Sequence, residues 1–592
     1  MEVIDVPVLI VGGGGAGLTA SMLLSGLGVE SLLVNALPTT SILPKAHILN
    51  QRAMEIMSDC GTADQIYGIA TPPENFSYTA IYAGFSGHPL AGKCIAKLEC
   101  WGNGGRDIEW AAASPLLSTN LPQIRLEPIL HRRAVALAPD RVRFNHELTS
   151  LSQDEQGVTA VIHDKNTDTD FTATARYLLA CDGGRTIGRL LGVEMVGVRR
   201  MASQVSIHLS ADFSNLASDD DVLIRWHFVP EISALVVMVP MGPDTWGTRS
   251  KEWVVHLNYP YEDPRMLDDH KIEADLRFAL GIGDHPLDIH FISNWAAEGI
   301  VADRFSDGRV FLAGDAAHKH PPTGGLGLTS GMHDVQNICW KLAAVLKGQA
   351  GPSLLTTYEA ERRPSIENNV KRSLENSHLW MLSGRELHVS DPDLSVDEKW
   401  DHLARLFSGA PEDADLVREV RQSLSSHSLE FHEQNVEYGY SYSSSAIVPD
   451  GTEPPPNPDD VRVYVMCTRP GHPLPHAWVD DPVTNERTST ISLVRPGHFT
   501  LIAGEDGRHW CDAATIVGAE LGVDIDSYTI GHTTGDYLDP RLTWARHRGI
   551  GARGAVLVRP DRYVAWRKAE SSTDPVAELS SVLRVILHRG SA

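Results

Sequence analysis

The sequence predicts an α/β protein organised around a Rossmann-type parallel sheet, and three features support this fold class. Residues 6–11 form a continuous apolar run that ends in a cluster of glycines. Residues 177–180 and 310–313 form two further apolar runs, each followed closely by an aspartate next to a glycine. Continuous apolar runs are typical of parallel strands that helices cover on both faces.

The first run leads into the strongest local motif of the chain. Residues 12–17 read G-G-G-G-A-G, which matches the pattern G-x-G-x-x-G, and residues 18–27 predict a helix. In this pattern the first glycine allows a tight turn, the second lets a pyrophosphate approach the backbone, and the third lets the helix pack closely on the strand. A glycine-rich turn without a ligand is the alternative explanation of this motif taken alone.

The second predicted strand, residues 31–35, ends at Asn35. An acidic residue is expected at this position, where it would hold the ribose hydroxyls of a dinucleotide. An amide also forms hydrogen bonds with hydroxyls, so Asn35 is compatible with the same role.

The two later runs place carboxylates at strand ends. Asp182 follows the first of them, and Gly314 with Asp315 follows the second. Residues 320–328 then read H-P-P-T-G-G-L-G-L and precede a predicted helix at 330–346. A carboxylate there can accept from ribose hydroxyls, and a glycine-rich helix start offers N–H groups to a phosphate or an electron-rich ring. Each feature alone could equally be an ordinary glycine turn.

In this order and spacing, the three motifs resemble those of the single-component FAD-dependent aromatic hydroxylases. Residues 45–56 (K-A-H-I-L-N-Q-R-A-M-E-I) and 121–130 (L-P-Q-I-R-L-E-P-I-L) resemble the phenol and chlorophenol hydroxylase branch of that family. The resemblance covers nearly the whole chain. Lys45 departs from it by standing where arginine is common, and Thr329 by standing where the loop often has asparagine. We expect both departures to tune the affinity for flavin without abolishing it.

The resemblance implies a role for each motif. The first would hold the ADP part of FAD, the aspartate–glycine motif would serve both FAD and NAD(P)H, and the glycine–aspartate motif with its loop would hold the ribityl chain and line the flavin ring. The cofactor-binding residues predicted in this way are Gly12, Gly14, Gly15, Ala16, Gly17, Asn35, Lys45, Arg52, Gln123, Asp182, Gly183, Gly314, Asp315, Pro322, Gly325, Gly327, Leu328 and Thr329.

The chemistry of this family uses NADH or NADPH and O2 and passes through a flavin C4a-hydroperoxide. A phenol reacts best with this intermediate when it is ionised to the phenolate. The phenol hydroxylase pattern carries a catalytic acid five residues before an arginine, which places His47 at that position if Arg52 is the arginine. A histidine with a pKa near 6.5 can accept a phenol proton. His47 could instead bond a backbone carbonyl or contact the flavin. Arg52 could hold a flavin phosphate, contact a carboxylate or be a solvated helix charge.

Other polar residues are weaker candidates. Asp107, Glu109 and Trp295 could border the substrate cavity, or be an exposed pair and a core aromatic. His318 and His320 follow the glycine–aspartate motif and are interpreted as packing or turn residues. No metal site is expected.

The motifs imply a discontinuous FAD-binding domain over residues 1–75, 120–195 and 300–375. An inserted substrate domain with a mixed sheet would take residues 75–120 and 195–300, including strands near 222–228 and 235–239. Residues 375–445 are predicted as a helical connection, with one helix over 365–380 that starts just after Pro364, and the proline-rich residues 449–458 as a linker. Residues 460–592 resemble the family's C-terminal thioredoxin-like α/β domain. They contain no C-x-x-C, so we expect them to stabilise the structure or a homodimer.

Composition excludes several classes of partner. The net charge of −25 disfavours nucleic acid and anionic membrane surfaces. Residues 6–29 carry no charge, but their glycines and acidic flank argue against a membrane or targeting segment. Seven widely spaced cysteines predict a reduced, cytoplasmic protein. The partners that the family resemblance implies are a small phenolic or other aromatic substrate, O2 and a second copy of the chain in a homodimer.

Two alternatives to a phenol hydroxylase stay open. The first keeps the cofactor and changes the substrate: a tailoring monooxygenase acting on a polyketide-like aromatic by hydroxylation or Baeyer–Villiger insertion. The second is a flavin- or nucleotide-binding protein without turnover. A halogenase is disfavoured because residues 226–230 (W-H-F-V-P) lack the second tryptophan of W-x-W-x-I-P. A plain NAD dehydrogenase would leave Gly314 and Asp315 unexplained.

Overall fold

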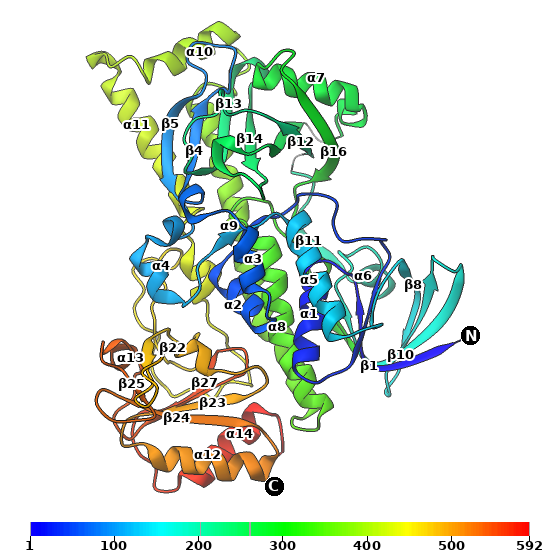
Figure 1. Cartoon of the computed structure of the whole chain (residues 1–592), viewed down its shortest axis with the longest axis vertical. Helices are drawn as coiled ribbons and strands as arrows, with labels where there is room; N and C mark the ends of the chain where they lie inside the picture. The colour runs from blue at the N-terminus through cyan, green and yellow to red at the C-terminus, as the bar shows by residue number, and fades with distance from the viewer. Residues whose placement is uncertain (1, 202, 260–261, 591–592) are drawn as a thin grey trace.

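The computed structural model describes residues 2–201, 203–259 and 262–590 and contains three regions stacked along the long axis of the molecule (Figure 1). The central region is an eight-stranded sheet. From edge to edge its main strands are β18 (Ser306–Asp307), β19 (Val310–Leu312), β10 (Thr169–Ala180), β1 (Val3–Val11), β2 (Ser31–Asn35) and β7 (Val142–Phe144). β1 runs parallel to β10 and β2, which confirms the predicted parallel sheet. The antiparallel pair β8 (His146–Gln153) and β9 (Val158–Asp164) extends it from β10.

Three helices pack side by side next to the central strands. α1 (Gly15–Gly26) packs between α5 (Gln123–Leu137) and α8 (Leu326–Leu346). The apolar residues from Val8 to Val11 of β1 are all buried, as expected for a strand covered on both faces. α8 starts four residues earlier than the sequence predicts, so the helix begins inside the glycine-rich loop.

The upper region is a seven-stranded sheet. Its order is β16 (Leu287–Ala296), β12 (Ser203–Ala211), β15 (Glu252–Tyr259), β14 (Ala234–Pro240), β13 (Val222–Val229), β4 (Tyr78–Ala83) and β5 (Lys93–Glu99). The strands expected near 222–228 and 235–239 are therefore confirmed. One face packs on α7 (Asp269–Leu280) through an apolar cluster that includes Ile207, Val255 and Leu276. The opposite face turns toward the central region.

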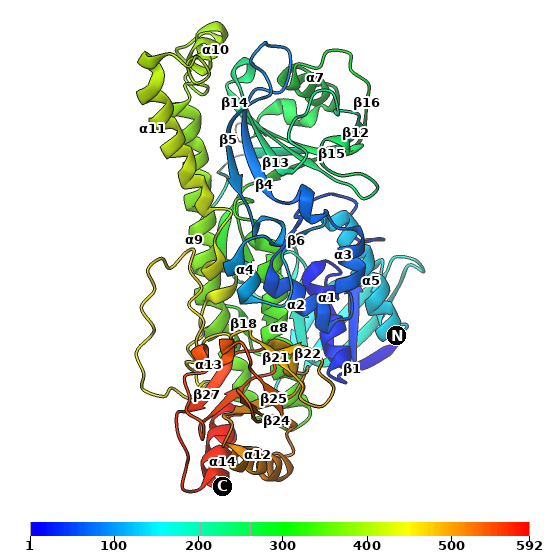
Figure 2. The same cartoon turned by 60° about the vertical axis from the view of Figure 1, so that its left-hand side comes forward.

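A long helix links the regions. α9 (Thr357–Glu386) runs from the central region up to the second sheet. There α10 (Val396–Arg405) lies at the top of the molecule, and α11 (Ala414–Ser425) returns alongside α9 (Figure 2). The predicted start after Pro364 is wrong, because the helix passes through this proline. Pro364 is exposed, while Arg362 and Ser365 beside it are buried, so tertiary contacts hold the helix together across the missing hydrogen bond.

The lower region is a seven-stranded mixed sheet formed by residues of the C-terminal segment. Its order is β22 (Arg487–Ser489), β21 (Trp478–Asp480), β25 (Tyr537–Leu538), β24 (Ile525–Gly531), β23 (Phe499–Ala503), β26 (Ala555–Val558) and β27 (Val564–Lys568). β23 and β24 are parallel, whereas β26 and β27 form an antiparallel hairpin. Helices α12 (Arg508–Leu521) and α14 (Pro575–Ile586) pack against each other beside the sheet.

Short elements complete the fold. The helices are α2 (Gln51–Asp59), α3 (Ala63–Ile69), α4 (Ile108–Ala113), α6 (Ile187–Leu190) and α13 (Thr543–His547). The strands are the pair β3 (Ile48–Leu49) and β6 (Thr119–Asn120) and the three-stranded sheet β11 (Met195–Val198), β17 (Gly299–Ala302) and β20 (His318–Lys319). No helix within the described residues is long and apolar enough to cross a membrane.

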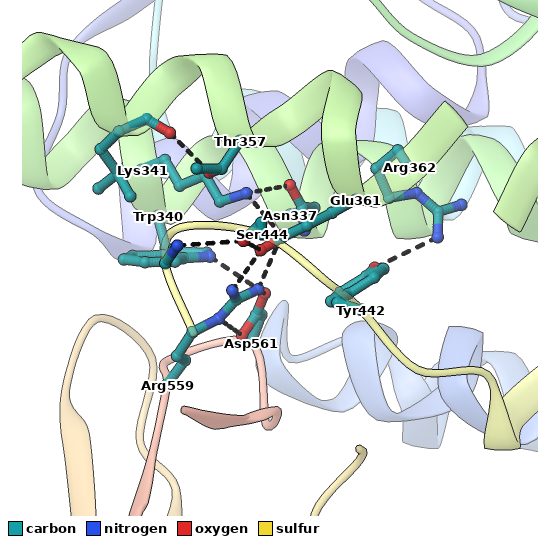
Figure 3. Close-up of polar contacts among 12 residues, drawn as sticks. Asn337, Trp340, Lys341, Thr357, Glu361, Arg362, Tyr442, Ser444, Arg559 and Asp561 are labelled. Atoms are coloured by element: carbon teal, nitrogen blue, oxygen red, sulfur yellow. Dashed lines mark hydrogen bonds and ion pairs between the residues drawn. The ribbon is translucent and has the colours of Figure 1, made fainter. Parts of the chain in front are cut away.

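A buried ionic network joins the lower region to the central one (Figure 3). Arg559 donates to both oxygens of Glu361 on α9, at 2.5 and 3.0 Å, and to both oxygens of Asp561, at 3.0 and 2.5 Å. Lys341 on α8 donates to the same Glu361 at 2.7 Å. Burial raises the pKa of Glu361, but the charges of Arg559 and Lys341 outweigh this and hold the pKa well below its usual value. Burial also lowers the pKa of Lys341 to about 8.

Replacement of Arg559 by glutamine tests this network. The substitution leaves Glu361 and Asp561 buried with too little positive charge, so the free energy of unfolding should fall by about 3 kcal/mol. Arg495, which pairs with Asp526 and is mostly exposed, provides the control, and Arg495→Gln should cost less than about 1 kcal/mol. Equal losses in urea-induced unfolding of the two variants would contradict a central role for the buried network.

Candidate active site

The glycine motif of residues 12–17 lies where the ends of β1 and β10 meet. A β-carbon on Gly12 would overlap the carbonyl oxygen of Cys181, and one on Gly17 would overlap the carbonyl oxygen of Gly12. Gly12 also has a φ of +116°, which an L side chain rarely adopts. The two glycines therefore permit the close packing of strand, turn and helix that the motif predicts.

Gly14 differs from these two because the space beside it is open. It is the N-cap of α1, its φ is −87°, and a β-carbon there would have Glu127 Oε1 as its nearest neighbour at 3.6 Å. No side chain caps α1, and its first turn holds no acidic residue. The N–H groups of Gly15 and Ala16 at this helix end are thus available for an anion. A side chain at position 14 would fill the open space at this helix end. Glycine leaves that space free, and it fits a bound pyrophosphate.

Asn35 closes the other side of this turn. Its side-chain oxygen accepts from the Gly13 N–H at 3.2 Å, and its amide nitrogen donates to the carbonyl oxygen of Leu37 at 3.3 Å. The residue thus lies beside the glycine motif, as its predicted role requires, and it is also part of the turn's own hydrogen bonding.

The glycine–aspartate motif packs directly on the first motif. A β-carbon on Gly314 would lie 3.3 Å from that of Ala16, and one on Gly15 would lie 2.7 Å from Leu328 Cδ1. The Gly314 N–H donates to Asp334 at 3.0 Å, a buried carboxylate on α8. Asp315 is exposed at the end of the strand. Motifs that lie about three hundred residues apart in the chain therefore meet at one place.

The loop that follows lies at the same place. Gly325 is the N-cap of α8, and a β-carbon on it would lie 3.2 Å from that of Ile48. Pro322 is exposed, and Gly327 has open space beside it except for His320 at 3.8 Å. Thr329 is buried and donates to the Leu326 carbonyl at 3.1 Å, so its side chain faces its own helix.

The Asp182 carboxylate binds backbone N–H groups. One oxygen accepts from Gly184 at 3.1 Å, and the other accepts from Thr186 at 2.7 Å and Ile187 at 2.9 Å. The carboxylate of the motif that the resemblance links to FAD and NAD(P)H thus stabilises the start of α6. Gly183 forms the same turn, and a β-carbon on Gly184 would lie 3.2 Å from the Asp315 carbonyl oxygen, so the second motif also reaches the common site.

Residues 41–46, which precede β3, form hydrogen bonds with the start of α5. The Gln123 N–H donates to Ala46 at 2.9 Å, and its side chain donates to Glu127 Oε1 at 2.5 Å. The other oxygen of Glu127 accepts from the Ser41 N–H at 2.6 Å. Sequence reasoning missed Glu127, which carries no local signal. Lys45 is exposed on this segment.

Arg52 is fully buried, so the solvated-charge interpretation is wrong. It donates to Glu55 at 2.8 Å, and its guanidinium lies 4.4 Å from the centre of the Tyr438 ring and 5.6 Å from that of Tyr563. Tyr563 belongs to the C-terminal region. Of the roles that the sequence left open for Arg52, the structure shows contact with a carboxylate, that of Glu55.

His47 faces Asn120 across the short β3–β6 pair. Its Nδ1 lies 2.5 Å from the Asn120 side-chain oxygen, while the Asn120 nitrogen donates to Thr71 at 2.6 Å. Because that oxygen can only accept, His47 carries its proton on Nδ1 and presents Nε2 as an acceptor. Burial lowers the pKa of His47 to about 4, against a smaller opposing effect of Asn120. The expected value near 6.5 is therefore wrong, and the imidazole is neutral at physiological pH.

A second histidine lies opposite His47 on the upper sheet. Burial, with a contribution from His47, lowers the pKa of His256 on β15 to about 4. His256 Nδ1 lies 2.8 Å from the hydroxyl of Ser206, which also accepts from Trp295 at 2.9 Å. The sequence singled out only Trp295 of this set. His256 and Ser206 were missed because they meet His47 only through the tertiary fold.

Polar side chains continue along the same face of β12. His208 lies 3.0 Å from Glu252, which also binds Arg125 of α5 at 2.7 Å, and Ser210 lies 2.6 Å from His290. Alternate residues of the strand, such as Ile207, point into the opposite core. The face turned toward the glycine motifs thus carries a row of hydrogen-bonding groups.

The remaining candidates are structural. Asp107 caps α4 by accepting from Glu109 and Trp110. His318 is buried 2.7 Å from Asp334, which also binds Arg362 at 2.8 Å. Among the residues that the structure describes, no cluster could hold a metal ion.

Comparison with known proteins agrees with this geometry. The family model for an FAD-binding domain matches residues 5–373, and that for the C-terminal part of aromatic-ring hydroxylases matches residues 467–590. Phenol 2-monooxygenase of Pseudomonas sp. (strain EST1001) is 34% identical, over 98% of this chain and 93% of that protein. Tetracenomycin B2 monooxygenase-dioxygenase of Streptomyces olivaceus is 32% identical over the full length of both. The crystal structure of the flavin-dependent monooxygenase PieE with FAD and substrate superposes with a TM-score of 0.91 at 37% identity, covering 99% of this chain and 100% of that one.

The fold and the converging glycine motifs define a flavoprotein monooxygenase. Within that class, the two matched domains and the relatives show that the chain belongs to the single-component FAD-dependent aromatic hydroxylases.

Two glycine substitutions should separate packing from cofactor binding. Gly17→Ala places a methyl group against the Gly12 carbonyl, so the free energy of unfolding should fall by about 3 kcal/mol or more. Gly14→Ala meets open space and should keep the fold, but it should weaken FAD binding at least about tenfold, or about 1.4 kcal/mol. Thermal unfolding and titration of the apoprotein with FAD measure the two effects. Full FAD affinity in Gly14→Ala would contradict a pyrophosphate at this position.

Proposed function

We propose that the protein hydroxylates a phenolic aromatic substrate with O2 and NADH or NADPH. The observation that carries this proposal is the meeting of three glycine motifs beside His47, opposite the polar face of the upper sheet. When bound, FAD supplies the redox chemistry, taking a hydride from the nicotinamide and activating O2.

The residues of the first motif would hold the ADP part of the cofactor. Gly14 leaves room for the pyrophosphate, the free N–H groups at the start of α1 bind it, and Asn35 lies on the ribose side. Gly314, Asp315 and the loop through Thr329 would hold the ribityl chain and the ring. Lys45, Gln123, Asp182 and Gly183 border the same site, while Arg52 acts on it through α2.

His47 would act on the substrate hydroxyl. Its Nε2 is an acceptor, so it could orient a phenol O–H and take its proton when the ring is hydroxylated. The resulting imidazolium is stabilised by the Asn120 oxygen at Nδ1. Burial opposes the charged form, so the proton is held only while the substrate carries the matching negative charge.

The row of polar groups on β12 favours the second substrate class. Ser206, His208 and Ser210 span about 13 Å along the strand, at roughly 3.3 Å per residue. A single-ring phenol cannot contact the whole row, whereas a fused-ring aromatic with several oxygen functions can. We therefore keep, as the second candidate, a tailoring hydroxylation or Baeyer–Villiger insertion on a polyketide-like aromatic.

The wider organisation is proposed on the same grounds. Residues 75–120 and 195–300 would form the substrate domain, because the upper sheet presents its polar face to the glycine motifs. The mixed sheet with α12 and α14 supports the thioredoxin-like interpretation of residues 460–592. We also propose a homodimer, from the family resemblance, and a cytoplasmic location, from the seven widely spaced cysteines.

The proposal is tested by NAD(P)H oxidation against a panel of single-ring phenols and fused-ring polyphenols, with hydroxylated product and peroxide both quantified. Oxidation coupled to product in the first group supports phenol hydroxylation, and coupling confined to the second group supports the tailoring reaction. Flavin-loaded protein that forms no product from either group would contradict both.

Replacement of His47 by glutamine should keep FAD binding and lower the rate of product formation about 100-fold. Titration of His47 should not change the wild-type rate between pH 5 and 8, because the imidazole is neutral above its pKa of about 4. Below pH 4 the rate should fall as His47 becomes protonated. His163→Gln, at a partly exposed position on β9, is the control. A His47→Gln variant as fast as wild type would exclude the base.

A further inference from the structure

A single turn of the C-terminal region reaches three helices of the central region. Residues 559–563 (R-P-D-R-Y) connect the antiparallel strands β26 and β27. Arg559 binds Glu361 of α9, and Asp561 accepts from Trp340 of α8 at 3.2 Å (Figure 3). The next two residues of the turn contact α2, the helix that follows His47.

Arg562 binds the C-terminal end of α2. Its two terminal nitrogens lie 2.7 and 2.6 Å from the two carboxylate oxygens of Asp59, the last residue of the helix. The two side chains are only 6% and 16% exposed. The guanidinium is further fixed by its donation to the Ile491 carbonyl at 3.2 Å. A bidentate pair of this burial constrains both distance and orientation.

The middle of α2 is held from the same side. Tyr563 lies against Arg52, which is paired with Glu55. The second oxygen of Glu55 accepts from Ser114 and Tyr438, each at 2.7 Å. Both oxygens of Glu55 therefore accept hydrogen bonds, whereas Nε and one terminal nitrogen of Arg52 have no partner among the described residues.

The N-terminal end of α2 leads directly to the proposed base. Asn50 caps the helix by accepting from the Ala53 N–H at 2.9 Å. Ile48 and Leu49 pair with Asn120 and Thr119, and His47 precedes them. α2 has nine residues and is about 14 Å long, so a shift of its far end moves His47 relative to Asn120.

We propose that the turn of residues 559–563 positions His47 for the reaction, acting through the Arg562–Asp59 pair and α2. Arg562 and Asp59 are positioning residues, since neither touches the reacting groups. The inference rests on the proposed function, because it assigns the C-terminal region a part in that chemistry. It also explains why a domain without a C-x-x-C accompanies the flavin-binding region.

The chain offers a matched control for this pair. Arg567 on β27 binds Asp450 in the proline-rich segment, with Nε 2.8 Å from the carboxylate, and the two side chains are 11% and 12% exposed. This second pair is as buried as the first and anchors the same hairpin. The other hydrogen-bond partners of Arg567 are Thr452 and Thr468, which lie outside α2, so loss of this pair should cost stability without moving His47.

The test compares Arg562→Gln and Asp59→Asn with Arg567→Gln in the full-length, FAD-loaded protein. The pKa of His47 is measured by the pH dependence of hydrogen exchange at its imidazole C2 position, read by mass spectrometry. Loosening of α2 admits water, so we expect this pKa to rise from about 4 toward 6.5 in the first two variants and to stay unchanged in the third. His256 of β15 is the titratable group that faces His47, and the same experiment reports it.

Activity provides the second measurement. In Arg562→Gln and Asp59→Asn the product formed per NAD(P)H oxidised should fall about tenfold, and the acidic limb of the rate profile should move upward with the pKa of His47. The charge-swapped double variant, Arg562→Asp with Asp59→Arg, should restore both. Arg567→Gln should lower the thermal midpoint alone.

The outcomes are distinct. An unchanged His47 pKa in the first two variants, or an equal change in Arg567→Gln, would overturn the positioning role. Wild-type protein that forms no product from any aromatic substrate would refute the proposed function instead, and the exchange measurement would still decide whether the turn holds His47.

Discussion

The close approach of the ends of β1 and β10 is the constraint on which the rest of the site depends. Gly12 lies against the Cys181 carbonyl and Gly17 against Gly12, with no space for a side chain at either. This packing brings the start of α1 next to the turn after β10 and, through Gly314 and Leu328, next to α8. A dinucleotide site results because helix and turn N–H groups converge where side chains are excluded.

A second constraint is the buried contact between the C-terminal region and the helices of the central region. Glu361, Arg559, Asp561 and Lys341 form a buried charge network that is costly to break, because removal of any one charge leaves an opposite charge without compensation in a medium of low polarity. The same turn carries Arg562 to α2. The two helices that leave the site, α2 after His47 and α8 after the glycine loop, are thus fixed by one segment of the C-terminal region.

The parts of this structure that local sequence determines could be predicted. The parallel strands, the glycine motif and the loop before α8 follow from apolar runs and glycine spacing, which act within a few residues. Glu127, Asp334, His256, Ser206 and Arg562 could not, because each contributes through a partner far away in the chain. The same limit explains the pKa of His47, since residue type suggests about 6.5 whereas burial lowers it to about 4. It also explains α9, which tertiary contacts carry through Pro364.

The most direct test of the account is a crystal structure of the protein reconstituted with FAD. The account predicts the pyrophosphate over Gly14 at the start of α1, the ribityl chain beside Gly314 and Asp315, and the flavin ring between His47 and residues 322–329, which form the end of the glycine loop and the first turn of α8. A pyrophosphate bound elsewhere, or a flavin ring separated from His47 by other side chains, would contradict it.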